Sequence, residues 1–432
     1  MDAETSSQSK SKCGNNKCIK RLERAVSQRG FLVIIFVLAL VVRAGYNLVF
    51  SRPDLPYNYE NSDAISYDNI AWNLLQGRGY SIDWNLFQGY EYRTDAVHPT
   101  AIRAPLFPLL LASTYVVFGH NWFIARLLLS VLSASTVLLT FIIGRRLFDA
   151  RIGATAAIVS VFYPAFVEYT GSLLTETLYI LLLALAVLCL ISEKLRGLSS
   201  VLVGGLIFGL IALTRPEGLL FIPFVTLWIL RQRGGLAGFK AAALFLAVTL
   251  LVYSSWVIRN YLVFGRLILA TTGGGMVMWG AHNPQAFTDY RLMGGWIYAP
   301  NLPHWEEIRD LPETDLDKAL WRLALNAIRE HLTLMPKLEL YKFYRLLLEG
   351  GALRDAINLT VLYFFAFGLT LTIAEKRPLT SLYLLFLAVM ANTLIFYGTP
   401  RFRLPVEPYI LLIASYGFWE QVALLKTRRA KR

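Results

Sequence analysis

Long apolar runs recur along the chain, separated by short polar stretches. Ten of these runs approach the length of about 20 helical residues needed to cross a hydrocarbon core of about 30 Å. A shorter run, 105–118, begins with two prolines and ends before Gly119. It is too short to span comfortably, so we expect a re-entrant or surface helix on the outer side. The ten predicted membrane helices lie near 31–50, 121–144, 152–169, 173–192, 198–214, 216–231, 238–258, 356–374, 378–397 and 404–424.

Composition supports the same class. Hydrophobic residues make up 56% of the 432 residues and charged residues only 16%, whereas soluble domains carry about 25% charged residues. We therefore expect an all-α integral membrane protein, a polytopic helical bundle. The net charge of +13 does not indicate a nucleic-acid partner, because no basic stripe with interleaved aromatics appears. Basic residues of this kind instead retain loops on the cytoplasmic side of a membrane.

The basic clusters predict the orientation. They fall on one side of the predicted bundle, so the positive-inside rule places both termini in the cytoplasm. This leaves two long outer segments, about 51–120 and 259–355. Residues 1–29 are expected to form a disordered basic tail, 30–425 one membrane domain, and 426–432 a second basic tail. The clusters are Lys20/Arg21/Arg24/Arg29, Arg145/Arg146/Arg151, Lys194/Arg196, Arg231/Arg233/Lys240, Lys376/Arg377 and Lys426/Arg428/Arg429.

The first outer segment opens with a short predicted helix. Ser62 is a plausible N-cap, which places Asp63 in the first turn. The helix dipole favours an ionised carboxylate there, so Asp63 is the candidate catalytic group, acting as a general base. The apolar face would comprise Tyr67, Ile70, Leu74 and Leu75, and the helix would end at Gly77 and Gly79.

Other charged residues gather at the predicted outer ends of apolar segments. Such residues are costly in lipid and usually face a wet cavity or a ligand. Each one alone could simply mark a helix end at the headgroup level, but the positive-inside bias should deplete arginines there. Arginines bind phosphate oxygens bidentately, and a nearby carboxylate could accept a proton from an attacking group. Together with Asp63, the set comprises His98, Arg103, Glu168, Glu176, Arg215, Glu217, Arg259, Asn260, Arg401 and Arg403.

Several ordered motifs carry a family resemblance. They are DAISYDNIAWNLLQGRGY, RAPLFPLLLASTYVVFGHNWFIARLLLSVLSASTVLLTFIIGRRLF, SLLTETLY, LTRPEGLLFIP, WVIRNYLVFGRLILATTGGGMVMWGAHN and RFRLPVEPYILLIASYG. In these motifs the chain resembles the membrane-embedded GT-C glycosyltransferases. This group includes protein O-mannosyltransferases and lipid A aminoarabinose transferases, and the chain looks most like the bacterial galacturonosyltransferase-like domain.

The resemblance implies a polyprenyl-phosphate-linked sugar donor and an acceptor on the outer side of the membrane. The acceptor class stays open among lipid, glycan and protein. The essential acidic residue of the first outer loop would map to Asp63, and donor-phosphate contacts to Arg103, Arg259, Arg401 and Arg403. Asn61 and Ser62 stand where many relatives have an acidic pair, which argues against a metal-bridged mechanism. We expect no cofactor.

A sugar or acceptor pocket is predicted from Tyr67, Glu176, Arg215, Glu217, His282 and Asn283. Alternative interpretations remain for several of them. Glu217 could serve only as an ion-pair partner of Arg215, and His282 and Asn283 could pack in a core. Asp315 and Asp317 form a D-x-D spacing without partner ligands, so we interpret them as a solvated helix N-terminus.

Two other function classes compete with a transferase. A transporter or flippase of lipid-linked substrates usually shows internal repeats, broken helices and midplane charges with short loops on both sides. This chain shows no repeat, places its charges at one face and carries large outer loops. A non-catalytic assembly partner would be expected to lose Asp63, which is present.

Overall fold

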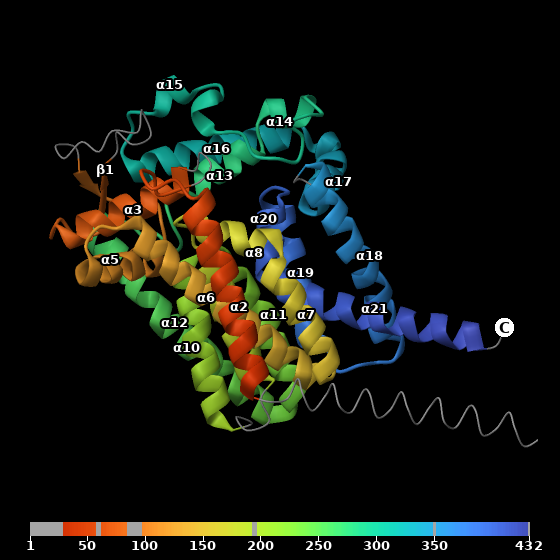
Figure 1. The fold of residues 1–432 in the computed structure, drawn as a ribbon. Helices are drawn as coiled ribbons and strands as arrows, with labels where there is room; N and C mark the ends of the chain where they lie inside the picture. The colour runs from red at the N-terminus through yellow and green to blue at the C-terminus, as the bar shows by residue number, and fades with distance from the viewer. Residues whose placement is uncertain (1–28, 58–61, 84–96, 192–196, 349–350, 431–432) are drawn as a thin grey trace, which may run out of the picture.

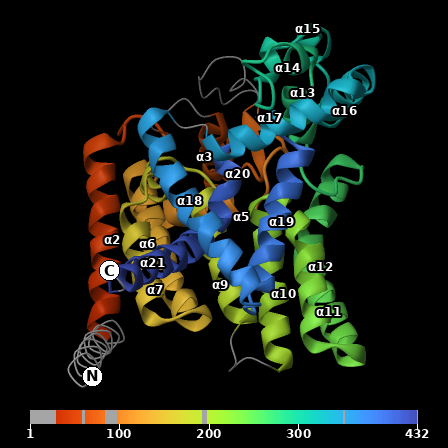
Figure 2. The same cartoon turned by 90° about the vertical axis from the view of Figure 1, so that its right-hand side faces the viewer.

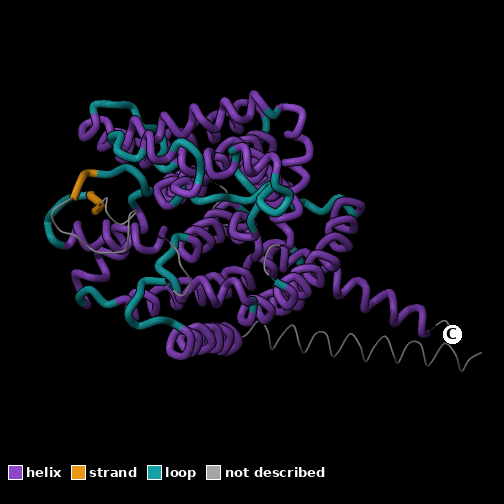
Figure 3. Tube along the Cα trace, turned by 90° about the horizontal axis from the view of Figure 1, so that it is seen from above, coloured by secondary structure: helices purple, strands orange, loops and turns teal. Residues whose placement is uncertain are grey.

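The computed structural model describes residues 29–57, 62–83, 97–191, 197–348 and 351–430 (Figure 1). Helices form most of this part of the chain, which confirms the predicted helical bundle. One addition to the all-α prediction is a pair of three-residue strands, β1 (Ser81–Asp83) and β2 (Val97–Pro99). They pair antiparallel, with Ile82 opposite His98. Figure 3 shows this small sheet at the edge of the outer face.

The bundle is built from helices at each of the ten predicted ranges. By length and composition alone, four of the described helices can cross a membrane: α2, α6, α12 and α18. The number rises to five if α7 and α8, which meet at a bend of 56°, form one span. The count of ten stays a prediction. The bundle elements are α2 (Arg29–Phe50), α6 (Trp122–Leu147), α7 (Ala150–Phe162), α8 (Pro164–Glu168), α9 (Glu176–Leu190), α10 (Leu198–Thr214), α11 (Phe221–Arg233), α12 (Gly235–Phe264), α18 (Ala352–Ala374), α19 (Thr380–Ile395), α20 (Pro400–Arg403) and α21 (Glu407–Ala430).

Shorter helices from the two predicted outer segments gather at one end of the bundle (Figures 1 and 2). The turns between α11 and α12 and between α18 and α19, which carry basic clusters, lie toward the opposite end (Figure 2). This separation is the one the charge pattern predicts, although the side of the membrane stays a prediction. The outer helices are α3 (Ser62–Leu75), α5 (Leu106–Phe118), α13 (Gly274–Ala281), α14 (Pro284–Thr288), α15 (Trp305–Ile308), α16 (Glu313–Glu330) and α17 (Met335–Leu348).

Local signals explain most of these boundaries. α3 begins at Ser62 with Asp63 in its first turn and ends before Gly77, which has a positive φ of 71°. α5 has its predicted bounds and is closed by Gly119. The second outer segment contains two separate helices, α16 and α17, where one longer helix could have formed. Pro336, in the first turn of α17, lacks the N–H and the space needed to continue the preceding helix.

Both predicted terminal tails lie partly outside the described residues. Residues 1–28, most of the predicted N-terminal tail, lie outside the described residues. Residues 426–430 of the second tail continue helix α21.

A buried arginine shapes the bend between α7 and α8. Pro164 has no N–H to offer the carbonyl of Ser160, four residues earlier. Arg43 of α2, fully buried, supplies the missing donors. Its guanidinium donates to the carbonyl oxygens of Ser160 and Val161, each at 3.1 Å, and to Ser133 Oγ at 2.6 Å. The bend turns α8 and the following residues toward the outer end, where the charged residues lie.

Candidate active site

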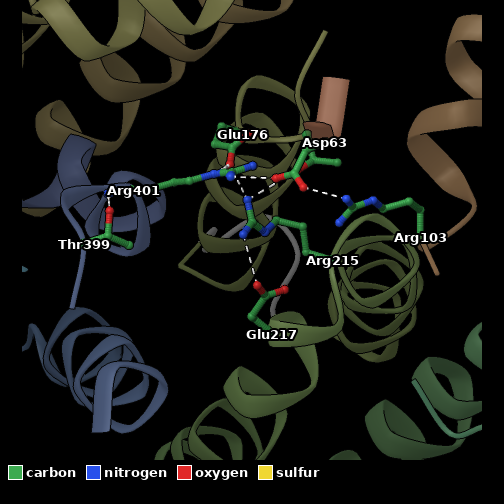
Figure 4. A network of polar contacts seen from close by, with 8 residues as sticks. Asp63, Arg103, Glu176, Arg215, Glu217, Thr399 and Arg401 are labelled. Carbon is green, nitrogen blue, oxygen red and sulfur yellow. Dashed lines mark hydrogen bonds and ion pairs between the residues drawn. The ribbon is translucent and has the colours of Figure 1, made fainter. Parts of the chain in front are cut away.

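Six of the charged residues selected from the sequence meet in one network at the outer end of the bundle (Figure 4). They form an alternating series of cations and carboxylates, each ion-paired to the next: Arg103, Asp63, Arg401, Glu176, Arg215 and Glu217. Their formal charges cancel. An incoming anion therefore has to compete with these carboxylates for the arginines, or use a guanidinium N–H that no carboxylate occupies.

Asp63 lies between two arginines. Arg103 Nη2 is 2.6 Å from Asp63 Oδ1, and Arg401 Nη1 is 2.7 Å from Asp63 Oδ2. The side chains of all three are about one-fifth exposed, so the trio faces an accessible space. Burial pushes the pKa of the Asp63 carboxyl upward, but Arg103 and Arg401 outweigh it and hold that pKa well below its usual range. Asp63 is therefore a carboxylate with both oxygens occupied by cations.

Glu176 holds the other half of the network. It stands in the first turn of α9 with only 2% of its surface exposed. One of its oxygens accepts from both Arg401 and Arg215. The second oxygen, Oε2, is buried and has no hydrogen-bond donor among the described residues. Arg215, just after the end of α10, is further fixed by Glu217 at 3.0 Å. Glu217 thus pairs with Arg215, as the alternative interpretation of Glu217 predicted.

Two tyrosines border the cluster. The Arg103 guanidinium lies 5.4 Å from the centre of the Tyr67 ring, which agrees with the predicted place of Tyr67. Tyr397 was not selected from the sequence. Its ring packs against Phe402, and its hydroxyl is within electrostatic range of Arg401 and Asp63. Its position four residues before Arg401, in the same polar turn before α20, was the available signal.

Arg259 does not belong to this network, contrary to the phosphate-binding prediction. Its guanidinium donates to the carbonyl oxygens of Thr100 at 2.6 Å and Tyr80 at 2.7 Å. It also lies over the rings of Tyr80, Trp256 and Phe264. These contacts give the Arg259 guanidinium a structural role, because they hold the end of α12 against the first outer segment.

Arg403 is likewise held apart from Asp63. It is 5% exposed, pairs with Glu407 one helical turn later, and donates to the carbonyl oxygens of Leu346 and Leu347, each at 3.3 Å. The sequence R-F-R puts Arg401 and Arg403 two residues apart, and only the turn at α20 decides which of them reaches Asp63.

His282 and Asn283 are engaged in the outer layer. His282 is 1% exposed, and its Nε2 lies 3.1 Å from the Nζ of the buried Lys342. Burial and Lys342 lower the pKa of His282 to about 3, so its imidazole is neutral. Asn283 caps α14 by accepting from Ala286 N at 3.0 Å. No described contact joins either residue to Asp63, which supports the packing alternative over the pocket prediction.

The two aspartates of the D-x-D spacing, Asp315 and Asp317, have different environments. Asp315 is 39% exposed and pairs with Arg266, as a surface helix N-terminus should. The prediction is wrong for Asp317, because its Oδ1 accepts from Gly275 N at 2.6 Å and links α16 to α13. Gly275 has to be glycine for that approach, since a Cβ there would collide with α16. The glycine run therefore serves packing.

The donor set around Asp63 does not fit a divalent metal. A metal needs free carboxylate oxygens, whereas both oxygens of Asp63 and one of Glu176 already carry arginines. Among the described residues no group of three or more His, Cys, Asp or Glu side chains could hold an ion.

The chain shares its fold with solved oligosaccharyltransferase structures, in agreement with the predicted resemblance to membrane-embedded glycosyltransferases. More particularly, residues 98–258 match a family model described as dolichyl-phosphate-mannose-protein mannosyltransferase. That segment includes Arg103, Glu176, Arg215 and Glu217, but not Asp63 or Arg401. No curated protein matches the chain in sequence.

Solved structures share the fold at low identity. The Archaeoglobus fulgidus oligosaccharyltransferase, in complex with Zn and sulfate, aligns over 92% of this chain and 50% of its own, with 13% identity and a TM-score of 0.55. AglB of the same organism, with an inhibitory peptide and a dolichol-phosphate, aligns over 95% and 51%, with 13% identity and a TM-score of 0.53. ArnT from Cupriavidus metallidurans, bound to undecaprenyl phosphate, aligns over 90% and 78%, with 15% identity and a TM-score of 0.44. The chain thus spans about half the length of the oligosaccharyltransferases it matches.

Proposed function

We propose that this protein is a membrane glycosyltransferase that moves a sugar from a polyprenyl-phosphate donor to an acceptor at the outer face, with Asp63 as general base. The observation that carries the proposal is the Arg103–Asp63–Arg401 trio, a carboxylate between two cations at an accessible site. The family match over residues 98–258 and the fold shared with an oligosaccharyltransferase solved with a dolichol-phosphate support the donor class. The acceptor stays open among lipid, glycan and protein.

The trio suits this reaction because Asp63 loses its negative charge while the leaving phosphate gains one. The acceptor oxygen attacks the anomeric carbon of the sugar, and the bond from that carbon to the phosphate oxygen breaks. The electron pair leaves with the lipid phosphate, which gains a negative charge, while the acceptor proton passes to Asp63. Protonation of Asp63 cancels the partner charge of Arg103 and Arg401. Both cations then become available to the leaving phosphate as its charge develops.

Arg103 is the arginine best placed to receive the phosphate first. Its Nε is buried and has no hydrogen-bond acceptor among the described residues. A phosphate oxygen can therefore bind there while Nη2 still contacts Asp63. By drawing Arg103 toward itself, the donor weakens one of the two ion pairs that suppress the basicity of Asp63. Donor binding thereby prepares the base.

Replacing Asp63 with Asn tests the assignment. The amide keeps the size and can still accept from one arginine, but it cannot take a proton at neutral pH. We expect normal abundance in the membrane and a loss of transfer of about 10²- to 10⁴-fold, the usual contribution of a general base. The measurement compares lipid-linked sugars and envelope glycans by mass spectrometry in cells with the wild type and the variant.

Asp54→Asn is the matched control, because Asp54 is exposed in the same outer segment and should leave transfer unchanged. An accumulating sugar phospholipid paired with one missing glycan in Asp63→Asn cells would identify donor and acceptor together. Full transfer by Asp63→Asn would overturn the role of Asp63. Altered sidedness of an unconsumed lipid-linked sugar, with no missing glycosidic bond, would instead indicate a flippase.

A further inference from the structure

A polar cavity lined in part by Arg401 adjoins the charged network. Its volume is about 140 Å³, roughly ten times the space of about 10–15 Å³ that one water requires. Its walls come from three elements distant in sequence: α8, the first turns of α18, and α20 with the start of α21. Because Arg401 lines this cavity and also contacts Asp63, a ligand in the cavity adjoins the proposed reaction centre.

The charged groups in the cavity wall are already neutralised in pairs. Arg354 Nη2 is 2.8 Å from Glu168 Oε2, and Arg403 pairs with Glu407. An anion entering here would meet two carboxylates and would have to break an existing ion pair to find a free cation. The cavity therefore disfavours phosphate and suits a ligand without charge.

One carboxylate oxygen in the wall is an acceptor without a hydrogen-bond donor among the described residues. Glu407 is 1% exposed, and its Oε2 has no donor among the described residues. A buried carboxylate oxygen without a partner is costly, and a hydroxyl group of a ligand would satisfy it. A phosphate diester or dianion has no hydrogen to give. The unpartnered oxygen thus favours a hydroxyl-bearing ligand over an anionic one.

The rest of the wall adds the other features of a carbohydrate site. Tyr163 donates its hydroxyl to Asn358 Oδ1 at 3.2 Å, which holds the amide of Asn358 at the wall. Tyr169 supplies a second aromatic ring. An amide, which donates and accepts, and a carboxylate, which accepts, lie beside aromatic rings, and together they complement the hydroxyls and apolar faces of a pyranose.

We propose that this cavity binds a neutral sugar ring, so that Arg401 stands between a sugar subsite and the base Asp63. Whether this sugar belongs to the acceptor or to the donor rests on the proposed function. Binding of a sugar in the cavity does not depend on that function, because it can be measured without turnover.

Binding is tested on the purified full chain in lipid nanodiscs with a panel of neutral methyl glycosides, detected by saturation-transfer NMR. Asn358→Leu removes the amide at similar volume, and Ala165→Phe fills the cavity from α8. We expect each to weaken glycoside binding about tenfold or more, which is the usual effect of one or two lost hydrogen bonds to a ligand. Asp63→Asn should bind like the wild type.

Thr360→Leu is the matched control on the same helix. Thr360 is exposed and does not line the cavity, and its hydroxyl donates to Ala356 O one helical turn earlier. The proposal is overturned if no glycoside binds the wild type at millimolar concentration, or if Asn358→Leu and Ala165→Phe bind as the control does. It is also overturned if inorganic phosphate, and no glycoside, shows binding that these variants lose.

Kinetics then identify the source of the sugar. Once donor and acceptor are known, a rise in the acceptor KM of Asn358→Leu with an unchanged donor KM assigns the cavity to the acceptor. The reverse pattern assigns it to the donor sugar. If both KM values match those of Thr360→Leu, the subsite is excluded even where Asp63→Asn has confirmed the transferase.

Discussion

At the scale of single residues, the basicity of Asp63 is the central quantity. Its two arginine partners stabilise the ionised form, which keeps the carboxylate charged but makes it a weak base. A general base works best when its pKa lies near the operating pH. In this geometry Asp63 is therefore a weak base, and the proposed arrival of phosphate at Arg103 is what would raise its basicity.

This balance predicts a pH profile. Because the pKa of Asp63 is depressed in the folded protein, activity that needs its ionised form persists above that pKa and is lost only as pH falls through it. We expect kcat/KM, which reports the free enzyme, to show no acid limb from Asp63 between pH 7 and about 4, the ordinary range of a carboxyl. Removing one cation, as in Arg103→Gln, should shift the acid limb to higher pH.

The profile is measured from pH 3 to 8 with wild type, Arg103→Gln and Arg78→Gln. Arg78 is exposed in the same outer segment and should leave the limb where it is in the wild type. An acid limb in the same place for all three proteins would show that Arg103 does not control the ionisation of the base.

At the scale of elements, the contact between α13 and α16 contains a buried carboxyl. Burial raises the pKa of Asp317 to about 7 while its Oδ1 accepts from Gly275 N. A carboxyl with a raised folded pKa binds its proton more tightly than in the unfolded chain. Its contribution to the free energy of unfolding is therefore greatest at low pH and is lost as pH rises from about 4 to 7.

Asp317→Asn should remove that loss. The amide oxygen can still accept from Gly275, and no charge has to be buried. We expect its thermal midpoint in detergent to exceed that of the wild type by several degrees at pH 8, and this gain to shrink as pH falls toward 4. Asp315→Asn, which changes the exposed neighbour paired with Arg266, should show no such pH-dependent gain. Equal midpoints for Asp317→Asn and wild type at pH 8 would contradict the prediction.

At the scale of the whole molecule, the two outer segments form one layer because specific contacts join them. Arg259, at the end of α12, holds Thr100 and Tyr80 of the first segment. Thr272 N also donates to Ala101 O at 3.0 Å. These contacts bring the loop with Arg103 and the helix with Asp63 to the same end of the bundle as α20.

Arg259→Gln should accordingly reduce stability rather than donor affinity. Two backbone carbonyls lose their donor, which costs about 2 kcal/mol in the free energy of unfolding. We expect a lower thermal midpoint but a donor KM close to that of the wild type, whereas Arg103→Gln should raise the donor KM. Arg266→Gln, at an exposed ion pair, serves as the control for loss of an arginine. A raised donor KM with unchanged stability in Arg259→Gln would restore its phosphate-binding role.

Much of this architecture followed from local patterns in the chain. Apolar runs predicted helices because backbone groups in lipid have to bond within their own segment. The prolines and glycines around α3 and α5 marked their ends because they restrict or extend backbone conformation. Charged residues at the ends of apolar segments were selected as site candidates because charge is costly in lipid. The structure brings six of them together: Asp63, Arg103, Glu176, Arg215, Glu217 and Arg401.

Only the tertiary structure decided how the selected groups pair. Sequence spacing does not say which side chains meet across helices hundreds of residues apart, so Arg259 and Arg403 could not be separated from Arg103 and Arg401 beforehand. The alternating ion pairs, the cavity behind Arg401 and the role of Arg43 at the α7–α8 bend all depend on contacts between distant elements. The sequence by itself determined which groups are costly to bury; the packed fold determined which partners offset that cost.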